Sequence, residues 1–300
     1  MSAPMTNRQN AGWYRFRLGA FEGTIVWDGY ISHGYDGVYP DADPAEFERL
    51  KTENNLPRDA FTMELNTAVV NMGDKLVVVD PGMGREITWF GENMGLVLEN
   101  YAAAGIDPAD VDAVLITHMH PDHIGGLINP DGSAVFPNAE LYCCDADWEE
   151  WTNEDNLKLN SFRGPWTEVA LKSVAPYRDR VNIFKAGDEL FPGVATFSIA
   201  GHSAGQTAFI FESEGEKIAF TGDVAHHHVF DPAHPEWIFN ATYDTDAELG
   251  AKAKADIFRK VVAENIRFHG YHFPYPGIGT IADNGDGSYR FVGEGVVPRL

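Results

Sequence analysis

Residues 117–126 read Thr-His-Met-His-Pro-Asp-His-Ile-Gly-Gly, so three histidines and one aspartate fall within six positions. The three residues before this stretch are apolar and predict a short buried strand that ends where the histidines begin. Histidine is the commonest metal ligand in proteins, and aspartate binds the same borderline cations. His118 and His120 are two apart in an extended segment and therefore point to the same side. The chain turns at a proline before Asp122 and His123, which predicts a second metal position beside the first.

Short apolar strands end in a ligand-type residue at three further places in the chain. These residues are His202, Asp223 and the pair His269 and His272. Side chains at the ends of neighbouring strands meet at one edge of an α/β sheet. Each of these residues is weak evidence by itself, because a histidine after a strand is more often structural. Together with residues 117–126 they complete two metal sites.

Asp80 also follows an apolar segment, residues 76–79. A carboxylate at this point can orient a ligand histidine from behind the metal. It can equally cap a helix or stabilise a turn, and the sequence leaves both interpretations open.

Composition bounds the class of protein. The chain has 300 residues, 44% of them hydrophobic, which is enough for a substantial core. Its formal net charge of −23 argues against nucleic acid and anionic membranes as partners. The two cysteines, Cys143 and Cys144, are adjacent, so no disulfide framework is expected. Residues 1–10 contain no apolar signal core, and no segment is long enough to span a membrane. We predict a soluble, cytoplasmic protein that acts on a small molecule.

Hydrophobic periodicity predicts alternating strands and helices. We interpret residues 1–300 as a single domain on which residues 1–60, an N-terminal extension with a long loop at 32–59, are packed. A turn is expected at Asp28-Gly29, and an irregular, aromatic-rich segment at 152–180. Strands are predicted at 13–18, 24–27, 67–71, 76–80, 114–116, 140–144, 194–200, 207–211, 217–221 and 266–268. Helices are predicted at 44–50, 85–104, 145–151 and 246–264.

Several aromatic residues are candidate walls of a substrate pocket. An aromatic pocket suits an uncharged acyl or aryl group. Each of these residues could equally belong to the core. His226, the first residue of a His-His-His run, is a further candidate, and its two neighbours are expected to be solvated or structural. The aromatic candidates are Phe90, Trp148, Trp151 and Trp166.

The ordered set of motifs resembles the metallo-β-lactamase superfamily over nearly the whole chain. The motifs are residues 117–126, Gly201-His202-Ser-Ala-Gly205, Thr221-Gly222-Asp223 and a late histidine. The Trp27-Asp28-Gly29 start, the Gly-Asp-Val-Ala-His run at 222–226 and the His-Phe-Pro-Tyr-Pro-Gly-Ile-Gly run at 272–279 are similar to one branch. That branch contains methyl parathion hydrolase and the N-acyl-homoserine lactonases. The resemblance implies an αββα sandwich: two mixed β-sheets face to face, helices on the outer faces, and metals at one edge.

The resemblance also implies a set of ligands. One divalent metal is expected at His118, His120 and His202, and a second at Asp122, His123 and His272, with Asp223 bridging the two. His269 competes for the last place, but the proline-aromatic run of the family directly follows His272. Zinc is expected, although iron, manganese or cobalt also suit these ligands. After the third ligand the family often has Thr-Pro-Gly-His where this chain has Ser-Ala-Gly-Gln at 203–206, so support around the site can differ.

A hydrolytic mechanism follows from the resemblance. A hydroxide shared by two cations would attack a lactone or ester carbonyl, or the phosphorus of an organophosphate triester. The leaving oxygen would be held by the other metal or protonated by Asp122 or Asp223. A glyoxalase II-like thioesterase or an iron persulfide dioxygenase would share the ligands. The glyoxalase usually has a helical C-terminal domain, and little follows His272 here. A nuclease would need a basic surface, and a non-enzymatic scaffold would have lost ligands. A homodimer is implied by the resemblance alone.

Overall fold

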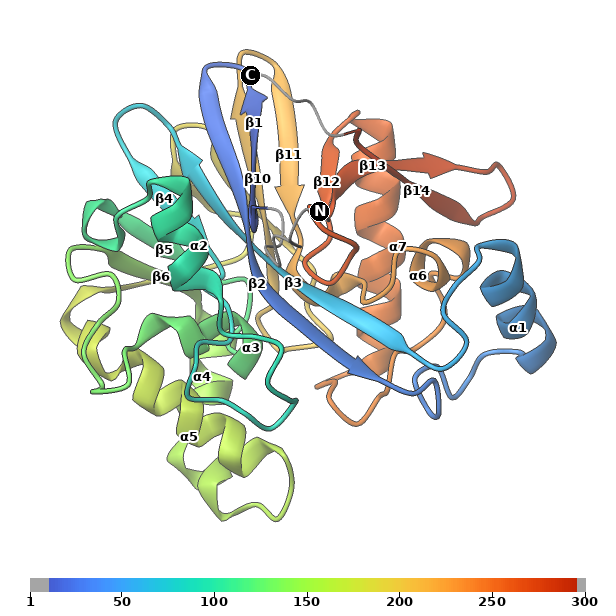
Figure 1. The fold of residues 1–300 in the computed structure, drawn as a ribbon, viewed down its shortest axis with the longest axis horizontal. Helices are drawn as coiled ribbons and strands as arrows, with labels where there is room; N and C mark the ends of the chain where they lie inside the picture. The colour runs from blue at the N-terminus through green and yellow to red at the C-terminus, as the bar shows by residue number, and fades with distance from the viewer. Residues whose placement is uncertain (1–10, 296–300) are drawn as a thin grey trace, which may run out of the picture.

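Two seven-stranded β-sheets face each other, with helices on their outer faces (Figure 1). The structure is a computed structural model and describes residues 11–295. Both sheets contain parallel and antiparallel pairs. The αββα sandwich predicted from the sequence is therefore confirmed.

The strands of each sheet come from one half of the chain. The first sheet has the order β1 (Trp13–Leu18), β2 (Phe21–His33), β3 (Phe61–Asn71), β4 (Leu76–Val79), β5 (Ala113–Leu115), β6 (Glu140–Cys144) and β7 (Val181–Phe184). The second has the order β14 (Tyr289–Gly293), β13 (Ile278–Asp283), β12 (Arg267–His269), β11 (Glu216–Phe220), β10 (Thr207–Ser213), β9 (Val194–Ser198) and β8 (Glu189–Phe191). The α-helices are α1 (Pro44–Glu53), α2 (Val97–Ala104), α3 (Pro121–Ile124), α4 (Asp145–Trp151), α5 (Arg163–Val174), α6 (Phe230–Ala233) and α7 (Ala247–Ala263).

Local sequence accounts for the ends of the two capped outer helices. Asp43 precedes α1, and its carboxylate accepts a hydrogen bond from the Glu46 backbone N–H at 2.8 Å. Asp246 caps α7 in the same way, accepting from the Leu249 N–H at 3.0 Å. Such caps satisfy backbone donors that the first turn of a helix leaves free.

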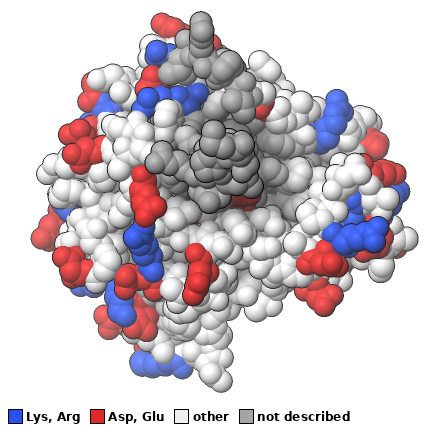
Figure 2. Space-filling view, viewed as in Figure 1, with Lys and Arg blue, Asp and Glu red and all other residues white. Residues whose placement is uncertain are grey.

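Charged side chains of both signs are interspersed on the surface. On the face drawn in Figure 2, Lys and Arg lie beside Asp and Glu and do not form a continuous basic patch. Arg49, for example, contacts Glu46 and Glu53 on α1. Exposed pairs of this kind contribute little to stability.

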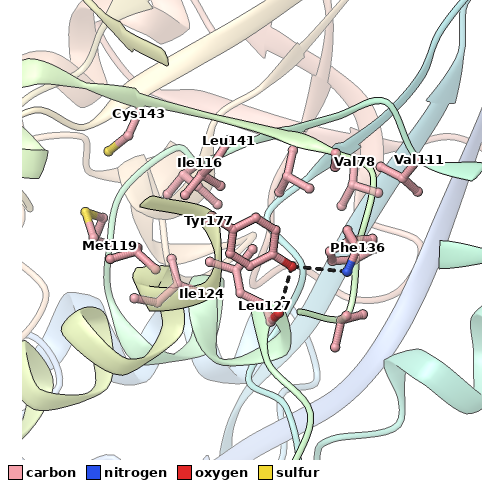
Figure 3. Close-up of a cluster of buried hydrophobic side chains, with 14 of the residues drawn as sticks. Val78, Val111, Ile116, Met119, Ile124, Leu127, Phe136, Leu141, Cys143 and Tyr177 are labelled. Carbon is pink, nitrogen blue, oxygen red and sulfur yellow. Dashed lines mark hydrogen bonds between the residues drawn. The ribbon is translucent and has the colours of Figure 1, made fainter. Parts of the chain in front are cut away.

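Apolar side chains fill the space between the sheets and beneath the helices. One cluster joins Val77 and Leu115 of the first sheet to Phe209 and Phe220 of the second. A second cluster lies under α2 and α5 and contains Tyr177 (Figure 3). The buried Tyr177 hydroxyl donates to the Leu127 carbonyl at 2.8 Å and accepts from the Phe136 N–H at 3.1 Å. The phenol is thereby buried without an unsatisfied polar atom.

The prediction of a helix at 85–104 is wrong for residues 85–96. Only α2 is helical, and the preceding loop contains Gly91 and Gly95 at φ values of 120° and 81°. Positive φ is incompatible with a right-handed helix. The buried Asp28 holds both ends of this loop, because its carboxylate accepts from the Met83 and Val97 N–H groups at 2.7 and 2.8 Å.

Two further predictions of local structure are wrong. The turn expected at Asp28-Gly29 is a bulge, and β2 continues beyond it to His33. Residues 152–180 are not wholly irregular, because they contain α5. In α5, Trp166, Ala170 and Val174 recur every four residues and are buried, which is the period of a helix that faces a core.

The membrane prediction can be compared with residues 11–295 only. None of the helices in that range has the length and apolar character needed to cross a membrane. The signal-core prediction concerns residues 1–10, which lie outside the described residues.

A buried ion pair ties α7 to the loop around α6. Lys254 of α7 contacts the Asp231 carboxylate and donates to the Trp237 carbonyl at 2.7 Å. Asp231 also accepts from the Tyr39 hydroxyl and the His226 N–H, both at 2.7 Å. Burial alone would raise the pKa of Asp231, but the Lys254 ammonium and its other donors hold it below the usual value.

We predict that Lys254→Met destabilises the fold by about 3–5 kcal/mol, because it leaves the Asp231 charge buried without its cation. Since the pKa of Asp231 is lowered on folding, its stabilising contribution is present above its unfolded pKa of about 4 and is lost as the pH falls below that value. Urea denaturation of Lys254→Met, with Lys252→Met on the exposed face of α7 as the matched control, measures the loss. Equal stability of the two variants at pH 7 would contradict this role.

Candidate metal centre

Ligand-type side chains from distant parts of the chain converge at one edge of the sandwich. His118 and His120 follow β5, His202 follows β9, Asp223 follows β11 and His272 follows β12. Because these strand ends lie at the same edge, the loops that follow them meet there.

The convergent side chains form two adjoining groups. Within each group the potential ligand atoms lie within 4.8 Å of one another. Asp223 faces both groups: its Oδ1 lies 3.0 Å from His123 Nε2, and its Oδ2 lies 3.5 Å from His202 Nε2. The first group is His118, His120 and His202, and the second is Asp122, His123, Asp223 and His272.

Several of these polar atoms are buried without a hydrogen-bond partner. They are the Nε2 atoms of His118, His120, His123 and His202 and the Oδ1 atom of Asp223. A buried polar atom without a partner costs about 1–3 kcal/mol, so such atoms are rarely gathered in one place without a ligand. Imidazole nitrogens and carboxylate oxygens suit Zn²⁺, and also iron, manganese and cobalt. The residues present therefore fit divalent metal ions.

The protonation of His118, His120 and Asp223 favours cation binding. Burial alone would lower the pKa of His123, His202 and His272, but the Asp223 carboxylate raises it, so a metal ion must displace their protons. Burial and the neighbouring imidazoles lower the pKa of His118 and His120 well below the usual value, so their rings are neutral and offer a lone pair. Burial alone would raise the pKa of Asp223, but the His272 and His123 imidazoles hold it well below the usual range. The carboxylate between the two groups is therefore ionised.

Asp80 lies behind the second group. Its Oδ2 is 2.9 Å from His123 Nδ1, and its Oδ1 accepts from the Thr117 backbone N–H at 2.8 Å. This contact fixes the imidazole so that its Nε2 points toward Asp223. Of the two interpretations of Asp80, the structure places the carboxylate where it orients a histidine.

Other groups that orient the cluster carry no sequence signal. Asp244 Oδ1 lies 2.7 Å from His202 Nδ1, and the Glu64 carbonyl oxygen lies 2.9 Å from His272 Nδ1. Tyr271 donates its hydroxyl to the Asp122 carbonyl at 2.6 Å. Sequence reasoning missed them for two reasons. Asp244 lies in a loop without a motif, and every residue has a backbone carbonyl, so the type of residue 64 does not reveal the contact with His272.

The other histidines near the cluster do not join the two groups. The ring of His269 is buried 5.1 Å from Phe220, outside both groups, whereas the preferred His272 lies within the second. His226 Nε2 lies 3.6 Å from Asp223 Oδ2, and with His202 and Asp223 it forms a further potential ligand set. His227 packs against Phe230.

A pocket of about 240 Å³ opens above the two groups. Its floor includes His120, Asp122, His202, Asp223 and His272, and its walls are mainly apolar. Among the five predicted wall residues, Phe90, Trp166 and His226 line it. Wall residues that the sequence did not predict are Ile31, His33, Asp36, Val38, Met63, Phe239, Asn240 and Tyr243.

The prediction was wrong for Trp148 and Trp151 as wall residues. Trp151 is fully buried behind His120, with ring centroids 4.9 Å apart, and its Nε1 donates to the Ser203 hydroxyl at 2.8 Å. Trp148 is partly buried against the core cluster under α5. Both lie on α4, whose apolar side chains pack inward, so they lie outside the pocket.

Comparisons with known proteins agree with this geometry. A model of the metallo-β-lactamase superfamily matches residues 65–266. The hydrolase AbOPH, of the β-lactamase superfamily, is 28% identical, with a TM-score of 0.87 over 96% of this chain and 99% of its own. AidC, a dizinc quorum-quenching lactonase, is 24% identical, with a TM-score of 0.86 over 95% of this chain and 98% of its own. Ribonuclease TTHA0252 of Thermus thermophilus is 32% identical over 161 residues. The matched region is 51% of this chain and covers only 33% of the length of the ribonuclease.

We predict that Zn²⁺ raises the unfolding temperature of chelator-treated protein, because ions that bind only the folded state stabilise it. The Asp223→Ala variant should lose most of this increase and most of the bound metal. Differential scanning fluorimetry and metal analysis by mass spectrometry measure both. His234→Ala, outside both groups, is the control. An Asp223→Ala protein with a full complement of metal would refute the assignment.

Proposed function

We propose that this chain, which belongs to the metallo-β-lactamase superfamily, is a dinuclear metal-dependent hydrolase that opens lactones or cleaves esters, with organophosphate triesters as a further substrate class. One observation carries the proposal: two adjoining groups of buried ligand atoms lie at the floor of a pocket with apolar walls. The similarity to the hydrolase AbOPH over nearly the full length of both chains supports a hydrolytic activity.

Two divalent ions at these residues, most suitably Zn²⁺, would supply Lewis acidity and an activated water near neutral pH. The chain itself contributes the arrangement around them. Asp223 stays ionised between the two groups, and Asp80 and Asp244 hold His123 and His202 in fixed orientations. Asp122 and Asp223 both line the pocket. Either carboxylate could therefore accept the proton that the attacking water loses and pass it to the leaving oxygen of a bound substrate.

The walls of the pocket favour an uncharged substrate. No Lys or Arg is among its lining residues within the described chain, and Asp36 adds a carboxylate on one side. Trp166 stacks on Tyr243 with ring centroids 5.3 Å apart, and these rings offer a flat surface to an acyl or aryl group. A phosphodiester or a carboxylate would meet no compensating cation in these walls.

The rival activities within the fold differ in the charge of their substrates. The matched ribonuclease suggests RNA, and a glyoxalase-like thioesterase would take a glutathione thioester. RNA carries one negative charge per nucleotide, and this chain carries a formal charge of −23. A persulfide dioxygenase would need iron and oxygen and would release no hydrolysis product. Substrate charge and metal dependence therefore separate the candidates.

We predict that zinc-loaded protein hydrolyses at least one neutral substrate among an N-acyl lactone, an aryl ester and an aryl phosphotriester. It should leave an RNA oligonucleotide and a glutathione thioester largely intact under the same conditions, because no Lys or Arg among the described lining residues of the pocket binds their further negative charges. Initial rates across this panel, with chelator-treated protein as the blank, measure the preference. Faster cleavage of RNA or of the thioester than of every neutral substrate would reject the proposal.

A further inference from the structure

Helix α4 packs directly behind the first ligand group. Two of its side chains, Asp147 and Trp151, lie one turn apart, and both are fully buried. Neither belongs to the ligand groups and neither lines the pocket above them. Their contacts run to the two loops that carry the three histidines.

The Asp147 carboxylate joins these two loops. Its Oδ2 accepts a hydrogen bond from the Met119 backbone N–H at 2.6 Å, and Met119 stands between His118 and His120. Its Oδ1 accepts from the Gly205 N–H at 3.2 Å and from the hydroxyl of Ser203, the residue after His202. This carboxylate thus joins two loops that are more than 80 positions apart in the chain, beside a backbone hydrogen bond from the Thr207 N–H to the Thr117 carbonyl at 2.9 Å.

Trp151 completes the same connection. Its Nε1 donates to the Ser203 hydroxyl at 2.8 Å, so that hydroxyl accepts from Trp151 and donates to Asp147. The Trp151 ring stands at 88° to the His120 ring. Helix α4 packs closely against the loop after His202, because a Cβ on Gly205 would come within 2.3 Å of the Asp147 backbone nitrogen.

The second ligand group is supported from other parts of the chain. Asp80 orients His123, the Glu64 carbonyl faces His272, and Tyr271 holds the Asp122 backbone. The two groups therefore differ in their direct supports and share the Asp223 carboxylate. Asp80 also reaches the first group through Thr117, whose hydroxyl donates to Asp80 Oδ2 at 2.6 Å and lies 3.1 Å from His118 Nδ1.

We infer that Asp147 is a positioning residue that sets the affinity of the metal position formed by His118, His120 and His202, while Asp80, which faces His123 directly, acts mainly on the other position. This inference rests on the proposed two-metal function. It concerns a residue that touches neither the metal ligands' side chains nor the substrate pocket, and that acts by holding the two ligand loops at a fixed separation.

The substitution Asp147→Asn tests this role with almost no change in volume. The carboxylate accepts hydrogen bonds on both oxygens, whereas an amide offers one acceptor and one donor. Whichever way the amide turns, an NH₂ group faces an N–H or a hydroxyl that needs an acceptor. Loss of a supporting contact of this kind typically weakens metal binding about 10- to 100-fold.

The experiment is chelator competition on metal-loaded protein, with released Zn²⁺ followed by a colorimetric indicator. We expect the wild type to release two ions in separable steps. Asp147→Asn should shift one step by about 10- to 100-fold in affinity. Asp80→Asn should shift chiefly the other step, with a smaller shift of the first because Asp80 reaches His118 through Thr117, and the double variant should shift both. Cobalt-substituted protein gives an independent readout, because the visible spectrum reports which coordination sphere changes.

Two controls separate positioning from general destabilisation. Asp145→Asn makes the same chemical change on the same helix, but within residues 11–295 Asp145 accepts only from the adjacent Ala146 N–H and the Cys144 thiol, so both release steps should match the wild type. Phe258→Leu removes packing from α7, away from the ligand groups, and should lower the unfolding temperature without shifting either step.

Unshifted release in Asp147→Asn would overturn the inference, as would an equal shift of both steps, because either result means that Asp147 does not act on one position. If the wild type binds a single ion, the two-metal function fails. The affinity for that single ion then tests Asp147. Weaker binding of the ion in Asp147→Asn supports the positioning role, and unchanged affinity rejects it. Wild type that binds no ion rejects both.

Discussion

The structure depends on keeping the Asp223 carboxylate ionised in a buried position. A buried charge is tolerated only when neighbouring groups compensate for it. Here the imidazoles of His123 and His272 lie 3.0 Å from its two oxygens, and His118 and His202 approach Oδ2 within 4 Å. Each of these histidines lies on the segment that follows a strand, His123 on the short helix α3 and the others in loops, so the strand ends of both sheets must meet at this carboxylate. The sandwich can be understood as the scaffold that satisfies this requirement.

A layer of aspartates behind the ligands gives the cluster its rigidity. Asp80 and Asp244 each face the Nδ1 atom of one imidazole, and Asp147 binds the backbone of two ligand loops. Burial raises the pKa of Asp147 and of Asp28 to about 7, although backbone N–H groups oppose the shift. Such carboxylates are costly to bury, and their hydrogen bonds offset that cost by fixing the loops. Part of the strongly acidic composition is therefore structural and does not act at the surface.

The sequence predicts those features whose causes are local. Residues 117–126 bring four ligand-type side chains together by spacing alone, and apolar runs such as β4 and β5 identify the buried strands. Features set by distant contacts were missed. The loop before α2 is held open by Asp28, more than 50 positions away, and nothing within 85–96 reveals that contact. The orientation of the Trp151 side chain, away from the pocket, likewise depends on its hydrogen bond to Ser203 on a different loop. The pocket walls also come from separate segments, so no single stretch encodes them.

The floor and the walls of the pocket come from different parts of the chain. The floor comes from the ligand loops, whereas Ile31 and Val38 of the wall belong to the N-terminal part of the first sheet and the loop after it. That loop is tied to the rest of the fold through the Tyr39 hydroxyl, which donates to Asp231, and Asp231 in turn holds the backbone of His226. The wall residues Trp166 and His226 also contact the cluster, at His120 and Asp223. Ile31 and Val38 are apolar and form no side-chain hydrogen bond to a ligand, so these wall positions can change without disturbing the cluster. Selectivity for the substrate can therefore vary while the chemistry at the floor stays the same, which is what one expects when many activities share one fold.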